Sequence, residues 1–135
     1  MTDAFELTST YVIASDNTAT VVEGGEAFWR GLAERDPHVQ AADGGSLVSS
    51  YQLAQHWPNW EMHPNGDEIV HSRGGRCELI LETNGGTDSV LMTSGRTVVI
   101  PRGTWHTVRV HEPAELLHIT YGSGTTFKPA DAEPQ

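Results

Sequence analysis

Short runs of β-branched, aromatic and aliphatic residues alternate with turn-forming sequences along most of the chain from residue 46 onward. Runs of this length, bounded by Gly, Pro, Asn and Asp, are typical of β-strands. Gly74-Gly75 and Glu112-Pro113 are two of the expected turns. The pattern predicts strands at residues 47–54, 60–63, 68–72, 76–82, 89–92, 97–100, 105–110 and 115–121.

The first 45 residues carry a different pattern. Residues 5–14 are rich in β-branched and aromatic side chains and predict one more strand. Residues 26–35 predict the one helix, which Asp36-Pro37 would end. Its apolar residues Ala27, Phe28, Leu32 and Ala33 fall on a single stripe.

Many short strands with one early helix favour an all-β barrel or sandwich over a parallel α/β sheet. A chain of 135 residues fits one domain with a sizeable core. We expect residues 1–45 to pack on a barrel formed by residues 46–129, and residues 130–135 to form a flexible tail.

Composition and charge narrow the possible partners. The net charge of −10 repels phosphate backbones, so we expect no nucleic-acid partner. No apolar run approaches the ~20 residues of a membrane helix, and the first residues do not form a signal peptide. We therefore expect a cytoplasmic protein without a membrane partner. Cys77 is the only cysteine, which excludes an internal disulfide, and we interpret it as a packing residue.

The side chains that are candidates for a functional site lie in residues 61–68 and at residue 106. Because side chains alternate along a strand, Glu61 and His63 point to one face and Trp60 and Met62 to the other. A carboxylate and an imidazole on an inner face are costly to bury unless something pairs with them, and a metal ion would do so. Glu68 after the next turn and His106 on a later strand complete a plausible ligand set for a divalent transition metal.

Two spaced motifs then resemble a known family. Glu61-x-His63-x4-Glu68-x6-Gly75 is similar to the first cupin motif, and Gly95-x5-Pro101-x-Gly103-x2-His106 to the second. Two positions differ from the usual pattern: Glu61 stands where the family has a histidine, and Val110 where it has an asparagine. The chain most resembles small single-domain bacterial cupins of the RmlC-like jelly-roll superfamily.

The resemblance implies a double-stranded β-helix, the cupin jelly-roll barrel, with a metal ion inside. It implies His63, Glu68 and His106 as ligands, with Glu61 beside them. Two roles for Glu61 stay open. It could ligate directly, in a set of two histidines and two carboxylates that favours Fe(II) or Mn(II), with Ni or Zn possible. Alternatively, it could stand off from a two-histidine, one-carboxylate site and orient a ligand or act as a base.

Three residues are candidates for catalysis: Glu61, His118 and Tyr51. His118 lies in the otherwise apolar run 116–119, where it could line the cavity or only hydrogen-bond to a neighbour. Tyr51 could line the pocket as well. Trp60 and Met62 on the outer face need cover from the N-terminal elements or from a second subunit, so we expect a homodimer.

These features favour a metal-dependent enzyme, a dioxygenase, isomerase or lyase, whose substrate is a small organic molecule with a carboxylate or enol group that binds the metal. The fold does not select among these reactions. The alternative is a non-catalytic cupin module that binds a small ligand or metal. A third possibility is a metal-storage protein without an organic ligand.

Overall fold

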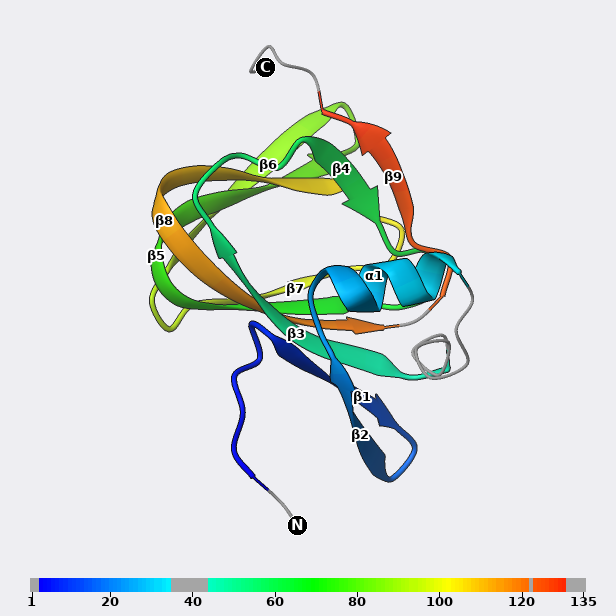
Figure 1. Cartoon of the computed structure of the whole chain (residues 1–135). Helices are drawn as coiled ribbons and strands as arrows, with labels where there is room; N and C mark the ends of the chain where they lie inside the picture. The colour runs from blue at the N-terminus through cyan, green and yellow to red at the C-terminus, as the bar shows by residue number, and fades with distance from the viewer. Residues whose placement is uncertain (1–2, 35–43, 122, 131–135) are drawn as a thin grey trace.

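The computed structural model describes residues 3–34, 44–121 and 123–130. Within these ranges, antiparallel strands build a barrel with a helix at one side (Figure 1). The elements are β1 (Thr10–Ser15), β2 (Thr18–Glu23), α1 (Glu26–Ala33), β3 (Ser46–Leu53), β4 (Asn59–Met62), β5 (Glu68–Thr83), β6 (Gly86–Thr93), β7 (Thr97–Ile100), β8 (His106–Tyr121) and β9 (Thr126–Pro129).

The two long strands β5 and β8 organise the barrel. They pair with each other over most of their length, and each curls from one side of the barrel to the other (Figure 1). The first half of β5 also pairs with β7 and the second half with β6, while β8 pairs with β3 and β4. All of these pairings are antiparallel, which confirms the expected all-β class.

The predicted turns at Gly74-Gly75 and Glu112-Pro113 were wrong. The pairs of strands predicted on either side of them are single strands, β5 and β8, that bend instead of reversing. Their mutual register shifts between Ser72 and Cys77, which marks β-bulges. Because a bulge adds backbone length on one strand only, it bends the pair sharply and keeps it hydrogen-bonded on both sides.

The N-terminal prediction was partly wrong. The strand begins at Thr10 instead of residue 5, and β2 follows it in a hairpin that the sequence did not predict. The turn of this hairpin places Asp16 at φ 52°, a conformation that aspartate tolerates better than most residues. The helix ends at Ala33, and the predicted stop at Asp36-Pro37 lies outside the described residues, as do residues 131–135 of the expected tail.

Two apolar clusters lie on either side of the space that holds the site. One fills the closed part of the barrel and contains Val70, Cys77, Leu79, Met92, Ile100, Val108, Ala114 and Leu116. The other joins β1, β3 and α1 through Tyr11, Ile13, Phe28 and Leu47. Cys77 is fully buried in the first cluster, in agreement with a packing role.

Trp60, on the outer side of β4, was expected to be covered by the N-terminal elements or by a second subunit, but β9 lies beside it instead. Lys128 of β9, a strand that the sequence did not predict, places its ammonium 5.8 Å from the ring centre of Trp60 and 4.5 Å from that of Trp105. The N-terminal strands instead extend the sheet from β3, and Phe28 of α1 packs against Tyr11. In the described part of the chain, no helix is long and apolar enough to cross a bilayer.

Candidate metal centre and its cavity

The structure brings Glu61, His63, Glu68 and His106 together. One potential ligand atom from each lies within 4.8 Å of the others. Local pairing explains the convergence, because Glu61 of β4 stands directly opposite His106, the first residue of β8. Glu68 is the first residue of β5, and its side chain is buried with those of His63 and His106.

The separations between these atoms match the edges of a metal coordination polyhedron. His63 Nε2 lies 3.1 Å from Glu61 Oε1 and 3.3 Å from Glu68 Oε2. His106 Nε2 lies 3.5 Å from Glu61 Oε1 and 3.2 Å from Glu68 Oε1. Ligands about 2.1 Å from a common ion are separated by roughly 3.0 Å in an octahedron and roughly 3.4 Å in a tetrahedron. An ion of ordinary size therefore fits among the four side chains.

Two of these atoms also lack a hydrogen-bond partner among the residues that the structure describes. Glu68 Oε1 and His106 Nε2 are buried and, although 3.2 Å apart, make no hydrogen bond of acceptable geometry with each other or with any other described residue. Buried polar atoms are rarely left unpaired, because the loss of hydration costs about 1–3 kcal/mol each. Both atoms would be satisfied by a cation placed between them, so the site fits a metal.

Surrounding groups hold the imidazoles in the orientation that ligation requires. His106 Nδ1 lies 3.1 Å from the Thr104 carbonyl, which can only accept, so Nδ1 carries the proton and Nε2 is left free. His63 Nδ1 is 2.9 Å from Thr125 Oγ1, which can take the same role. Such outer contacts fix the tautomer and the ring plane of ligating histidines.

Without a metal ion, the two histidines of the cluster form ion pairs with the two glutamates. Burial lowers the pKa of His63 and His106, but the facing carboxylates of Glu61 and Glu68 outweigh this effect and raise the two pKa values to about 9 and about 10. Burial raises the pKa of both carboxyls, but the facing histidines outweigh it and hold them below their usual range. Two positive and two negative groups thus face each other in the metal-free protein, and a divalent ion would replace two protons.

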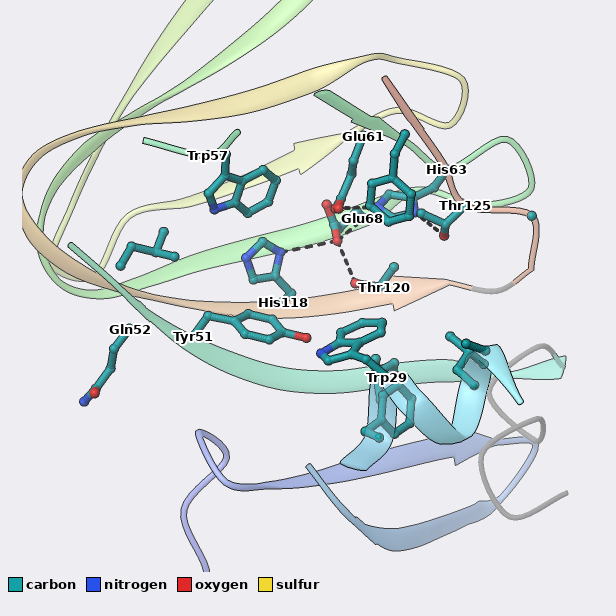
Figure 2. A pocket seen from close by; sticks show the side chains of 17 residues that line it. Trp29, Tyr51, Gln52, Trp57, Glu61, His63, Glu68, His118, Thr120 and Thr125 are labelled. Carbon is teal, nitrogen blue, oxygen red and sulfur yellow. Dashed lines mark hydrogen bonds and ion pairs between the residues drawn. The ribbon is translucent and has the colours of Figure 1, made fainter. Parts of the chain in front are cut away.

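A cavity of about 1020 Å³ leads from the surface to this cluster (Figure 2). Its outer wall is apolar and includes Phe28, Trp29 and Leu32 of α1. Aromatic rings continue inward, and the deep end carries the oxygen and nitrogen atoms of Glu61, His63, Glu68, His118, Thr120 and Thr125. His106 does not line the cavity and is completely buried behind it. The site is therefore accessible from one side and enclosed by protein on the other.

The candidates His118 and Tyr51 both line this cavity. His118 is 2% exposed, and its Nδ1 lies 3.3 Å from Glu68 Oε2, while its Nε2 has no hydrogen-bond partner within residues 3–34, 44–121 and 123–130. Trp57 stacks on the His118 ring at 22°, and Tyr51 meets it edge-on. Burial raises the pKa of the Tyr51 phenol, which remains neutral and cannot serve as a base at ordinary pH.

Several residues of the site were missed in the sequence. Thr120 donates a hydrogen bond of 2.6 Å to Glu68 Oε2, and strand alternation could have found it, because it lies two residues beyond His118. Thr125, Trp57, Trp29 and Phe127 reach the cavity from loops, from α1 and from β9, and no periodic signal identified them.

No protein-family model matches the chain. A curated relative, the uncharacterized protein L612 of Acanthamoeba polyphaga mimivirus, is 28% identical over 107 residues, which are 79% of this chain. The chain spans 60% of the length of that relative.

Among solved structures, oxalate oxidase in complex with the substrate analogue glycolate superposes with a TM-score of 0.51 at 22% identity, over 61% of this chain and 45% of the other. A cupin protein from Bacteroides fragilis superposes with a TM-score of 0.50 at 19% identity, over 59% of this chain and 68% of the other. With the two long bent strands and the antiparallel barrel, these similarities show that the chain has the cupin fold.

Proposed function

We propose that this chain is a metal-dependent enzyme that acts on a small organic molecule bound at a divalent ion inside the barrel. Glu61, His63, Glu68 and His106 are the proposed ligands. The observation that carries the proposal is the convergence of Glu68 Oε1 and His106 Nε2, which have no hydrogen-bond partner in the described part of the chain, with His63 and Glu61 at the end of a cavity open to the surface.

Of the two roles considered for Glu61, direct ligation has the better support. Its Oε1 lies within 3.5 Å of both histidine Nε2 atoms, as a fourth ligand would. Its side chain is also only 19% exposed, between the cavity and the buried ligands. Two imidazoles and two carboxylates favour Fe(II) or Mn(II) over softer ions, with Ni or Zn as possible occupants.

A bound ion would supply Lewis acidity or, if it is iron or manganese, a site for redox chemistry. The residues that line the cavity would bind and orient the substrate. The aromatic walls remove water from a bound substrate, and Trp29 at the outer end fits a flat organic body. A substrate carboxylate or enol oxygen would occupy the side of the cluster that faces the cavity. Tyr51, with a neutral hydroxyl, and His118, which contacts Glu68, are the side chains placed to contact that substrate or orient the ligand.

The test begins with elemental analysis of untagged protein purified without added metal. We expect about one divalent ion per chain, and its loss in His106→Ala and Glu68→Gln. His71→Ala is the matched control, because His71 bonds Thr97 on the outer face of β5 and is remote from the cluster. Undiminished metal in His106→Ala would overturn the site.

An assay for substrate conversion distinguishes the proposed enzyme from the alternative function, a non-catalytic module that binds a small ligand or metal. We expect the metal-loaded protein to convert some member of a panel of small carboxylic acids and phenols, assayed with and without oxygen. Tight binding of a panel member without conversion, in protein that holds its metal, would favour the binding module.

A further inference from the structure

The outer face of the sheet carries a row of aliphatic residues, one on each of six neighbouring strands. The register makes them direct neighbours: Val21 opposes Val12, Val12 opposes Val48, and Val48 opposes Ile119. Beyond β8, Ile119 opposes Ile69 and Ile69 opposes Val99. We call this set the aliphatic row; its members are Val21, Val12, Val48, Ile119, Ile69 and Val99.

Strand alternation places the aliphatic row away from the cavity. Glu68 and Val70 on either side of Ile69 are buried, and so are Leu47 and Ser49 on either side of Val48. The row itself faces outward: Val21 is 55% exposed, Val99 56% and Ile69 38%. The rows beside it are mixed: Tyr121, Ala14, Ala19 and Leu117 lie on the same face, and so do the polar residues Glu23, Thr10, Ser46, His71 and Thr97.

The size of this surface approaches that of a protein interface. Six strands about 4.8 Å apart span roughly 29 Å, and three rows along the strands span roughly 20 Å, which gives about 600 Å². The aliphatic row is a continuous apolar stripe through this area, and contiguous exposed apolar surface marks interaction sites more than isolated apolar residues do. A stable complex buries about 800 Å² on each partner, which the aliphatic row, the mixed rows beside it and the surrounding polar surface together can supply.

We propose that a second copy of this chain packs on the aliphatic row, face to face, about a two-fold axis between Val48 and Ile119. Such an axis maps the row onto itself, so that Val21 meets the partner's Val99 and Val12 meets the partner's Ile69. Every contact within the row then joins β-branched aliphatic side chains, and both copies use the same patch, as in an isologous interface. An unrelated partner would not need a row that is uniform on both sides of its midpoint.

The net charge of the chain also supports a second copy as the partner that binds the aliphatic row. Two copies that each carry a net charge of −10 repel each other, and association costs least where neither surface bears charge. None of the six members of the row is charged. Charged groups lie at the margins: Glu23 follows Val21 on the same face at the β2 end, and the ion pairs Asp67–Arg102 and Glu115–Arg73 lie beyond the row. This surface is distinct from the outer side of Trp60 and Met62, on which the sequence-based expectation of a homodimer rested.

The experiment is light scattering on size-separated protein at about 1–100 µM. Wild type is expected at twice 14.7 kDa, roughly 29 kDa. Ile69→Lys and Val99→Lys each place an ammonium in the interface twice, once per copy, and should raise the dimer dissociation constant about 100-fold or more. Leu91→Lys is the matched control, because Leu91 is 45% exposed on the outer face of β6, away from the row.

Circular dichroism checks that each variant is folded, which is expected because the substituted side chains are already exposed. Dissociation by both row variants but not by Leu91→Lys supports the interface. A wild type that stays monomeric over the whole concentration range overturns it. A dimer that survives both row substitutions, or that only Leu91→Lys disrupts, also overturns it. None of these outcomes depends on the metal content of the protein.

Discussion

Thr120 contacts the proposed metal centre through a hydrogen bond of 2.6 Å to Glu68. Its hydroxyl donates to Glu68 Oε2, the oxygen that also faces His63 and His118. Thr120→Val keeps the shape of the side chain and removes this donor, so we expect metal affinity to fall about 10-fold or more. Thr120→Ser keeps the hydroxyl and should restore most of it. Competition with a chelator of known affinity measures both; equal affinity in Thr120→Val and wild type would contradict the role.

At the scale of elements, the bend in β5 depends on Gly75. Its φ is +78°, and a Cβ at this position would lie 2.0 Å from the Pro113 carbonyl oxygen of β8. Backbone atoms on both strands would have to move, so Gly75→Ala should lower the free energy of unfolding by about 2–4 kcal/mol. Gly74→Ala is the matched control, since a Cβ there meets nothing within 4 Å, and it should cost less than about 1 kcal/mol. Urea unfolding compares the two; equal losses would show that the close approach of β5 and β8 is unimportant.

At the scale of the whole molecule, metal binding and pH are linked through His63 and His106. Their pKa values in the metal-free fold, about 9 and about 10, exceed the value of roughly 6.5 expected in the unfolded chain. The stability that they contribute is therefore complete below pH ~6.5 and is lost as the pH rises through 9 to 10. A metal ion competes with these same protons, so its affinity should rise over that range.

The rise in melting temperature on addition of Mn(II) should therefore grow from pH 6 to pH 9, because the metal-free fold weakens while the metal binds more tightly. Thermal melts with and without metal at each pH test this expectation. His106→Ala should show little gain at any pH. A gain that is constant with pH would mean that the ion binds elsewhere.

The sequence by itself determined the strand class and the four candidate ligands. Glu61 and His63 were predicted on one face because alternation along a strand is a local property of the backbone. Glu68 and His106 followed from motif spacing, which encodes the same local geometry at two separate places. Their gathering within 4.8 Å agrees with the predicted convergence, and their role as metal ligands stays a prediction.

Only the tertiary structure decided how distant segments meet. Whether Gly74-Gly75 turns or bends β5 depends on the partner strand β8, which no local pattern reveals. Trp29 and Trp57 reach the cavity because α1 and the loop before β4 fold across its walls. The aliphatic row exists only through the register of six strands drawn from residues 12 to 119, where a one-residue slip of any strand would turn its member inward. The spacing of residues along the chain determines which side chains share a face of one strand. Surfaces and cavities depend instead on pairings between residues far apart in the chain.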